Sequence, residues 1–444
     1  MKFWYNPNFI AIAAIVILSL IALKSLIYSD FYTSHDGETH TARIAQYYQA
    51  VKDGQFPPRY AGSFYNYLES PIFVYIYPLP YILGSVFHLI GFSFTDSFKL
   101  LMILGFVLSQ VFAYLWLFAL FRDRKAAFIG AIFYCWVPYR FLLIYVRGSV
   151  SEVLAYTFVP LSLYFVTRAH LENKNIFFVL TTIAISAVFL SQNLVALLTI
   201  PVISMYAVLL ALFSKSVKFF LKYVFCVVWA LLISSFTYLP SLFERQYVRF
   251  DSSFNLAYGE HYVCFRQMIR SPWDYGFDFP GCLKDSMSLS LGLGHLLMII
   301  IFIFVFIYMS YKTKILSKDL IVAAAFFAVL GLSVFIMLDS QPTKFVWKNI
   351  KQLQLIDIPW RFTGLFALSS SVLAAFLVKS TKVPLIMIIL LLAVLVSNRN
   401  HIRVNKSIQY GDRHFLNYKG TATERSEFTP NFGVSQIPDI EYRV

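Results

Sequence analysis

Long apolar runs recur along almost the whole chain, and they limit its fold more than any other feature. Runs of roughly 18 or more residues are long enough to cross the hydrocarbon of a bilayer as a helix. Only 14% of the residues are charged and 59% are hydrophobic, whereas a soluble domain carries about 25% charged residues. The sequence therefore predicts an all-α polytopic membrane protein. The runs lie at residues 9–28, 71–92, 99–121, 126–146, 150–166, 176–190, 194–213, 219–239, 289–309, 320–338, 362–378 and 383–396.

The sequence also argues against a cleaved signal peptide and against a nucleic-acid partner. The first apolar run is too long for the core of a cleaved signal peptide, and Lys24 and Tyr28 stand where small residues would precede the cleavage site. We therefore expect a retained first span. The net charge of +14 is divided among short loops between apolar runs. That distribution is typical of cytoplasmic loops, so nucleic acid is not an expected partner.

The basic loops predict the orientation of the chain. Because short basic loops between spans face the cytoplasm, the N-terminus is predicted to be cytoplasmic, in a multi-pass protein of the cytoplasmic (inner) membrane. We expect a transmembrane domain over 1–397, whose loops 29–70 and 241–288 lie outside, followed by a short extracytoplasmic polar tail over 398–444. The basic loops are 122–125, 168–174, 214–222, 311–318 and 379–382.

The stretch 71–121 has to cross the membrane an odd number of times for this orientation to hold, yet it contains two apolar runs. Pro78 and Pro80 lie in the first of them, and proline removes a backbone donor and breaks a helix. Irregular backbone at membrane depth is tolerated where it packs on protein or lines a cavity. We therefore expect about eleven full crossings and one irregular segment, or about 11–12 transmembrane segments in all.

The first outer loop contains the most informative polar stretch, residues 34–43. Asp36 can cap a helix that begins near Glu38, and Ile44, Tyr47, Tyr48 and Val51 supply an apolar stripe at helical spacing. Gly54 suits the end of such a helix. The sequence predicts an interfacial helix here that does not span the membrane.

Three side chains fall on one face at the start of this helix: Asp36, His40 and Arg43. The positive end of the helix can bind an anion, and the carboxylate can act as a base toward a hydroxyl. The alternative is that Asp36 is only a helix cap and that His40 is an ordinary surface residue.

Five further polar residues interrupt the apolar pattern at predicted outer ends of spans. Arg147 and Glu152 lie between two apolar runs, where a charge usually pairs or lines a polar cavity. Gln192 and Asn193 interrupt another run, as a polar hairpin or as a pair facing a cavity. Arg361 lies at the mouth of a span, either as a Trp-Arg anchor or as a bidentate phosphate ligand.

The large outer loop 241–288 is long enough to form a lid. Cys264 and Cys282 both lie in it, and in an oxidising compartment they are candidates for a disulfide. Cys135 and Cys226 lie within apolar runs and are expected to be packing residues. No Walker loop, dinucleotide glycine motif, His-x-x-x-His pair or Gly-x-Ser-x-Gly elbow occurs in the sequence. We therefore expect no metal site and no cofactor, although the carboxylates leave a divalent metal possible.

Several motifs in combination match a known pattern. The chain resembles the bacterial membrane family named "6-pyruvoyl-tetrahydropterin synthase-related", which is itself similar to GT-C glycosyltransferases and not to a pterin enzyme. The resemblance runs from about residue 9 to residue 396. The motifs are His35-Asp36-Gly37 with His40 and Arg43, Gly54 to Arg59, Pro78 to Tyr81, Tyr145 to Ser149 with Glu152, Ser191-Gln192-Asn193, Trp273 to Gly276, Met287 to Gly292, and Pro359 to Phe362.

The resemblance implies a GT-C-like bundle with an acidic residue in the first outer loop that contacts or activates an acceptor. It assigns that catalytic role to Asp36. It also implies that outer basic residues hold a polyprenyl-phosphate-sugar donor. The chain departs from the family at Gln192, where a histidine is expected. The candidate substrate-binding residues are Glu38, His40, Arg43, Arg59, Arg147, Glu152, Gln192, Asn193 and Arg361.

The leading hypothesis is a membrane glycosyltransferase that moves a sugar from a polyprenyl-phosphate-linked donor to an extracytoplasmic acceptor. Its partners would be membrane lipid, that donor, and a glycan, lipid or protein acceptor. One alternative is a transporter or flippase for lipid-linked glycans. Transporters place ionisable groups near the midplane, whereas here they are predicted almost entirely at the ends of spans. The other alternative is a non-catalytic membrane protein of envelope assembly.

Overall fold

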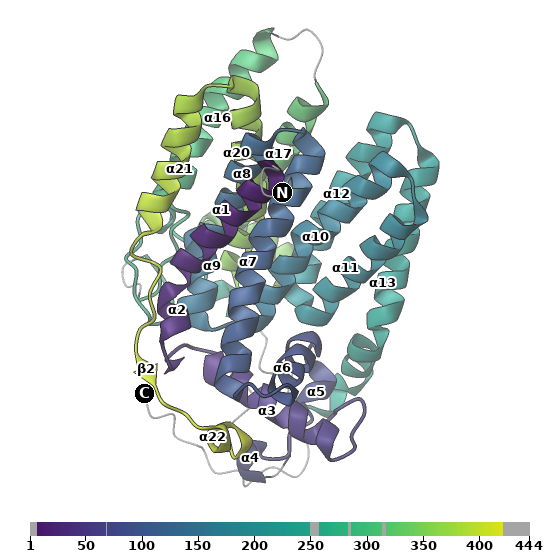
Figure 1. Cartoon of the computed structure of the whole chain (residues 1–444), viewed down its shortest axis with the longest axis vertical. Helices are drawn as coiled ribbons and strands as arrows, with labels where there is room; N and C mark the ends of the chain where they lie inside the picture. The colour runs from purple at the N-terminus through teal and green to yellow at the C-terminus, as the bar shows by residue number, and fades with distance from the viewer. Residues whose placement is uncertain (1–6, 68, 249–256, 283–285, 313–316, 421–444) are drawn as a thin grey trace, which may run out of the picture.

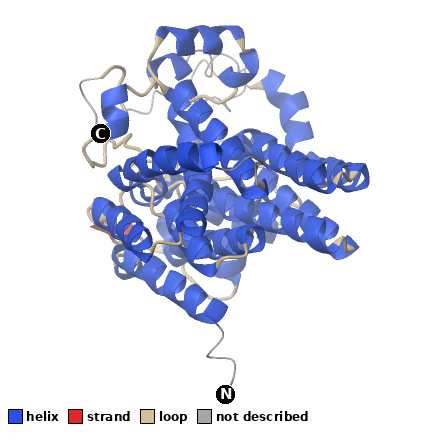
Figure 2. Ribbon diagram, turned by 90° about the horizontal axis from the view of Figure 1, so that it is seen from above, coloured by secondary structure: helices blue, strands red, loops and turns tan. Residues whose placement is uncertain are grey.

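The molecule is built almost entirely of helices. The computed structural model describes residues 7–67, 69–248, 257–282, 286–312 and 317–420 (Figure 1). The part of the chain so described contains a single two-stranded sheet, visible as a small red element beside the blue helices in Figure 2. The predicted all-α polytopic class is therefore confirmed.

Seven helices among the described residues are long and apolar enough to cross a membrane. All seven coincide with apolar runs of the sequence. A helix is suited to such runs because it satisfies its backbone hydrogen-bonding groups internally. The seven helices are α7 (Phe94–Phe121), α10 (Val150–Glu172), α12 (Asn193–Ser214), α13 (Val217–Glu244), α16 (Leu293–Lys312), α17 (Lys318–Met337) and α20 (Thr363–Thr381).

The run predicted as one span at 126–146 forms two helices with a bend between them, and it counts as an eighth candidate crossing when the pair is taken together. Helix α8 (Arg124–Cys135) is followed by α9 (Pro138–Phe141) and the π-helix η1 (Leu142–Arg147), bent by 54° from it. The bend lies at Val137, which is extended because the ring of Pro138 excludes the helical conformation in the residue before it. After the bend, η1 ends at Arg147.

Four shorter apolar helices complete the bundle: α1 (Pro7–Ala22), α6 (Leu79–Leu89), α11 (Asn175–Ser191) and α21 (Pro384–Asn398). The predicted number of about 11–12 segments is reached only when these are counted as spans. Helix α6 has 11 residues, about 16 Å, which is far shorter than the roughly 30 Å of bilayer hydrocarbon. The break between α5 (Ile72–Tyr75) and α6 falls at Pro78, so this segment is irregular, as its prolines predict.

The centre of the bundle is formed by α7, α8, α10, α17 and α20, which pack on one another. Within its apolar window α20 is 94% buried, whereas α16 is only 22% buried. Three consecutive serines and three alanines lie on α20, all buried. Such small side chains let neighbouring helices approach closely, which explains the central place of α20.

The first outer loop and the segment after α21 lie together at one end of the bundle, the lower end in Figure 1. Strand β1 (Phe31–Tyr32) pairs with the antiparallel strand β2 (Ser407–Ile408). Helix α3 (Gly37–Lys52) packs against α6, α7 and α22 (Asp412–Leu416). Residues 421–444 of the predicted tail, and 249–256 and 283–285 of the large loop, lie outside the described residues.

Helix α3 occupies the predicted position of the interfacial helix. Its buried surface is wider than the predicted stripe, because His40, Thr41 and Arg43 are buried with Ile44. Val51, by contrast, is 45% exposed. Packing on three sides explains the difference, since a helix inserted among three others has no wide solvent face.

Six short elements form the remaining connections. They are α2 (Lys24–Tyr28), α4 (Phe64–Tyr67), α15 (Phe265–Ile269), α18 (Gln341–Asn349), α19 (Lys351–Gln354) and the 3-10 helix η4 (Pro359–Phe362), with two further 3-10 turns, η2 (Arg245–Tyr247) and η3 (Ala257–Glu260).

Candidate functional site: a buried chain of ion pairs beneath the first outer loop

The His-Asp-Gly stretch before α3 lies against the Arg-Gly-Ser stretch after η1. The backbone N–H of Asp36 donates to the carbonyl of Arg147 at 2.7 Å, and that of His35 donates to Val146 at 2.9 Å. Gly148 ends η1 with φ +66°, and a Cβ atom there would lie 2.9 Å from the Cα atom of Gly37. Only glycine combines this conformation with so close an approach.

The carboxylate of Asp36 is not used as a helix cap. Asp36 occupies the N-cap position of α3, but its side chain accepts no hydrogen bond from the helix backbone. Its Oδ2 atom instead accepts from Nη2 of Arg147 at 3.1 Å. The Asp36 side chain is 33% exposed while that of Arg147 is 12% exposed, so the carboxylate is the solvent-facing member of the pair.

Arg147 leads from Asp36 into a buried chain of opposite charges. Its Nη1 atom pairs with Oε1 of Glu152, whose side chain is 1% exposed. The same oxygen accepts from Nη1 of Arg361 at 2.7 Å, and Nε of Arg361 lies 3.0 Å from Oδ1 of Asp357. We call these five residues (Asp36, Arg147, Glu152, Asp357 and Arg361) the charge cluster.

Two aromatic residues hold the charge cluster in place. The hydroxyl of Tyr139 donates to Oε2 of Glu152 at 2.8 Å. The guanidinium carbons of Arg147 and Arg361 lie 5.3 and 5.9 Å from the ring centre of Trp360, within the range of a cation–π interaction. Both arginines are therefore oriented by a carboxylate and by an aromatic ring.

The large outer loop covers this arrangement. The Trp360 indole donates to Asp278 at 2.8 Å, and the Nδ1 atom of His261 lies 2.6 Å from the same carboxylate oxygen. Burial by itself raises the pKa of Asp278, but the hydrogen bond and charge of His261 outweigh it and lower that pKa below its ordinary value. His35 stacks on Phe277 of the same loop with ring centres 4.2 Å apart.

A second branch of polar contacts runs from α3 to α6. Nδ1 of His40 lies 3.1 Å from the hydroxyl of Tyr81, and Nη1 of Arg43 donates to that hydroxyl at 3.3 Å. Tyr81 stacks with Tyr77, whose hydroxyl accepts from Nε2 of Gln192 at 3.5 Å. Burial, with the nearby charge of Arg43, lowers the pKa of His40 to about 3, so the imidazole is neutral near pH 7.

Three predicted site residues lie elsewhere. Glu38 accepts from Nε2 of His414 on α22 at 2.7 Å and belongs to the contact between α3 and the segment after α21. Within the described residues, no hydrogen bond or ion pair joins the Arg59 side chain to the charge cluster. Asn193 begins α12 and is exposed, whereas its neighbour Gln192 is buried. Gln192 lies in extended backbone between α11 and α12, whereas Asn193 is the first residue of α12, so the two side chains belong to different local structures.

Sequence reasoning missed the parts played by Tyr139, Asp357 and Asp278. Asp357 lies four residues before Arg361, which is a pairing distance on a helix and was the one usable signal. Tyr139 contacts the cluster because the chain bends before α9. Asp278 lies close to the cluster because the large loop folds back over Trp360. Neither approach leaves a mark in local sequence.

Arg140 corrects the expectation that ionisable groups lie almost entirely at the ends of spans. It is 1% exposed and donates through Nη2 to Ser109, near the middle of α7. Its guanidinium carbon lies 5.5 and 5.3 Å from the ring centres of Tyr134 and Tyr156. Its Nε and Nη1 atoms have no hydrogen-bond partner among the described residues.

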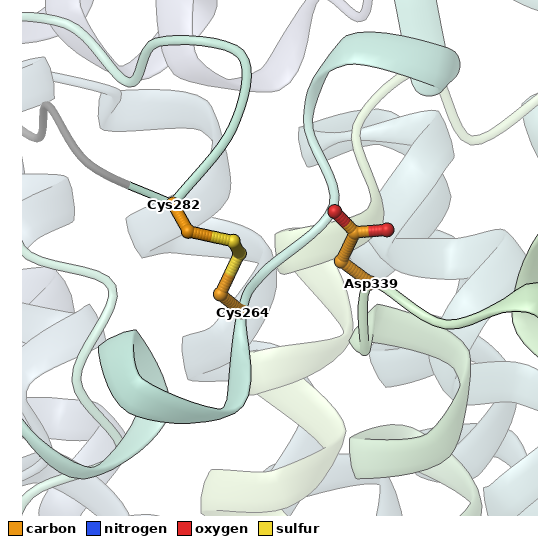
Figure 3. A group of neighbouring side chains, drawn as sticks. All are labelled: Cys264, Cys282 and Asp339. Atoms are coloured by element: carbon orange, nitrogen blue, oxygen red, sulfur yellow. A yellow bond between two sulfur atoms is a disulfide. The ribbon is translucent and has the colours of Figure 1, made fainter.

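Cys264 and Cys282 form a disulfide, with Cα atoms 5.7 Å apart, as the sequence led us to consider. Figure 3 shows the bond beside the carboxylate of Asp339, and the three potential ligand atoms lie within 4.8 Å of one another. Disulfide sulfurs are not thiolates, and a metal needs the thiolate form. Asp339 is also paired with Lys344 at 2.5 Å. This donor set is therefore unsuited to a divalent metal while the disulfide is intact.

Comparison with known proteins supports the resemblance over part of the chain. Residues 73–264 match the model of the "6-pyruvoyl-tetrahydropterin synthase related domain; membrane protein" family, a stretch that includes Arg147 and Glu152. No curated protein matches the chain. Among solved structures, the apo form of the Archaeoglobus fulgidus oligosaccharyltransferase is similar, with 12% identity and a TM-score of 0.49. The similarity covers 96% of this chain and 57% of that enzyme.

Proposed function

We propose that the chain transfers a sugar from a polyprenyl-phosphate carrier to an acceptor hydroxyl on the extracytoplasmic side of the cytoplasmic membrane. The observation that supports this most directly is the position of Asp36. Its carboxylate is a third exposed and makes no helix-capping hydrogen bond. It is the solvent-facing member of the charge cluster and is paired with Arg147. The match over 73–264 is to a membrane protein family, and the motif resemblance to that family implies a GT-C-like glycosyltransferase.

Asp36 acts as the general base in this proposal. An acceptor hydroxyl gives its proton to the carboxylate while its oxygen attacks the anomeric carbon of the donor sugar. The bond between that carbon and the phosphate oxygen breaks, and the phosphate leaves with the electron pair. Polyprenyl phosphate is thereby released, and the sugar is joined to the acceptor oxygen.

Arg147 and Arg361 stabilise the leaving phosphate. Such a group needs electrostatic stabilisation more than protonation, and arginines that are already oriented do not have to reorganise during the reaction. In the structure, Arg147 forms ion pairs with both Asp36 and Glu152. When Asp36 accepts the proton it becomes neutral, so its pair with Arg147 weakens as the phosphate gains negative charge.

The polar contacts between α3 and α6 bind the sugar of the donor in this proposal. Tyr77, Tyr81 and Gln192 offer hydroxyl and amide groups of the kind that bind sugar hydroxyls, and Arg43 adds a cation beside them. In this proposal the donor lipid lies within the membrane near α6, whose 11 residues leave part of the bilayer depth unfilled by that helix.

The test is incubation of purified protein with a panel of polyprenyl-phosphate sugars, followed by measurement of released polyprenyl phosphate. We expect release with at least one donor and a loss of about 10²- to 10⁴-fold in Asp36→Asn. The matched control is Asp53→Asn, which changes the exposed aspartate at the other end of α3. Full activity of Asp36→Asn, or equal losses in both variants, would reject the role of Asp36.

A transporter of lipid-linked glycans is the second candidate, and Arg140 is the observation in its favour. A buried arginine near the middle of a span, with two nitrogen atoms unpaired within the described structure, is typical of a substrate or ion pathway. Proteoliposomes separate the two functions. Donor movement across the bilayer that survives Asp36→Asn but not Arg140→Gln, without release of lipid phosphate, would favour transport.

A further inference from the structure

A second polar region lies at the opposite end of the bundle from the charge cluster. Helix α20 begins at Thr363, two residues after Arg361, and ends at Thr381, with Lys382 as its C-cap. Its 19 residues rise by about 28 Å, close to the thickness of bilayer hydrocarbon. Lys382 is therefore separated from the charge cluster by roughly one membrane thickness, and it lines the same cavity as Ile10 of α1.

A cavity of about 820 Å³ opens there between α1, the α7–α8 connection and the α20–α21 connection. Its volume lies within the range of sites that hold small organic ligands. Two kinds of residue line it, polar and apolar. The polar residues are Arg122, Asp123, Arg124, Lys125 and Lys382, and the remaining ones are Ile10, Ala11, Ala14, Phe118, Phe128, Val378, Val383, Pro384 and Met387.

The polar side of the cavity is strongly basic. Four cations stand against the single carboxylate of Asp123, and that carboxylate accepts the backbone N–H of Ala126 at 2.9 Å as the cap of α8. Arg122 and Lys382 are the C-caps of α7 and α20, both in the left-handed conformation. Two helix ends therefore bring cations to the same opening.

The apolar side lies between α1 and α21. Ile10 of α1 is 56% exposed, and Ala11 and Ala14 are small residues one and four positions further along that helix. Ala11 and Ala14 line the cavity together with Met387 of α21. This wall is suited to a hydrocarbon chain and not to a free inorganic anion.

Cations at helix C-termini also complement the helix dipole, and basic loops follow the cytoplasmic side of membrane proteins. Those two effects account for the charges but not for a cavity that joins them to an apolar wall. Basic pockets between transmembrane helices on the cytoplasmic side bind anionic lipid head groups. We propose that this cavity binds one anionic glycerophospholipid, with its phosphate on the basic side and an acyl chain against α1 and α21.

The site goes beyond the proposed glycosyl transfer, because it lies across the membrane from Asp36. The experiment measures binding of phosphatidylglycerol and phosphatidylcholine to the purified full chain by native mass spectrometry. We expect phosphatidylglycerol to bind at least tenfold more tightly. Combining Arg122→Gln, Arg124→Gln and Lys382→Gln is expected to lower that preference by about tenfold to a hundredfold, since each cation near a membrane surface contributes about 1 kcal/mol.

Two further variants make the result specific. Lys215→Gln combined with Lys218→Gln and Lys312→Gln removes the same charge from exposed positions that do not line the cavity, and should leave the preference unchanged. Ala14→Trp fills the apolar side without changing charge, and should weaken phosphatidylglycerol binding at least tenfold. Both variants must remain monodisperse, which size-exclusion chromatography checks.

Four outcomes would overturn the proposal. They are an unchanged lipid preference in the Arg122, Arg124 and Lys382 variant, an equal loss in the lysine control, competition by millimolar inorganic phosphate, and preferential binding of polyprenyl phosphate. If a second copy of the chain filled the cavity instead, a dimer would form that Ala14→Trp disperses, and no lipid preference would be seen.

Discussion

Glu152 is the residue on which both arginines of the charge cluster depend. Its single Oε1 atom pairs with Arg147 and Arg361, and its side chain is almost fully buried. A buried charge that loses its partner is strongly destabilising, because the low-dielectric interior cannot solvate it.

Replacing Glu152 with Gln leaves Arg147 paired with Asp36 and Arg361 paired with Asp357, so the expected cost is about 1–3 kcal/mol of stability. The measurement is thermal unfolding of the purified protein in detergent. Glu172→Gln is the control, because Glu172 pairs with Arg168 and Lys174 near the end of α10, where water can solvate the partners. Equal shifts of Tm in the two variants would show that the cluster is not held together by Glu152.

His40 gives the protein a predicted sensitivity to acid. Its pKa falls from 6.5 to about 3 in the folded protein, so the unfolded chain takes up the proton first as the pH falls. The stability contributed by neutral His40 is fully present above about pH 6.5 and is lost progressively between about pH 6.5 and pH 3. We expect His40→Gln to reduce the fall in Tm between pH 7 and pH 5.

Tyr81→Phe is the matched variant for this test. It removes the hydroxyl that contacts His40 but keeps the ring that buries it. Because burial is the main cause of the lowered pKa, this variant should keep the native dependence of Tm on pH. A native slope in His40→Gln would assign the acid sensitivity to other groups.

At the scale of elements, the contact between the first outer loop and η1 depends on Gly148. Alanine there would adopt an unfavourable φ of +66° and place its Cβ atom 2.9 Å from the backbone of Gly37. Neither backbone can move without breaking the hydrogen bonds that join Asp36 to Arg147. The expected cost of Gly148→Ala is roughly 2–5 kcal/mol, from strain and overpacking together.

Gly54→Ala separates strain from overpacking. Gly54 also has a positive φ, +89°, but a Cβ atom there would meet nothing within 4 Å. We expect a cost of only about 1–2 kcal/mol in its Tm-derived stability, from the conformation alone. If both alanine variants lost the same stability, the close approach of the two stretches would contribute nothing.

At the scale of the whole molecule, the disulfide fastens the large outer loop over the charge cluster. The bond joins Cys264 to Cys282 across 18 positions, and the closed segment contains Asp278 and Phe277, which contact Trp360 and His35. Closing a loop of this length contributes about 3 kcal/mol by restricting the unfolded segment.

Cys264→Ser combined with Cys282→Ser is expected to make the segment between them more susceptible to limited proteolysis while the transmembrane bundle stays intact. Mass spectrometry of the fragments locates the cuts. Cys135→Ser is the control, because Cys135 is a buried free thiol in α8. Cleavage that is equally slow in all three proteins would mean that the loop is held by its other contacts.

The sequence alone predicts the class of the protein, because apolar runs of spanning length admit few structures other than membrane helices. It also predicts α3 and the break before α6, since caps and prolines act through local chemistry, whereas it offers Cys264 and Cys282 only as candidates for a disulfide. It does not predict that α8 and η1 form a bent crossing, although Pro138 marks the place where it bends.

Only the tertiary structure decided which polar residues meet. Asp36, Arg147 and Arg361 are brought together from three distant parts of the chain, with Glu152 between the arginines, while Glu38 and Asn193 are directed elsewhere. The physical reason is that the buried arginines of the charge cluster are stabilised by carboxylates that arrive from other parts of the chain. That arrival is a property of packing, and no local pattern of residues encodes it.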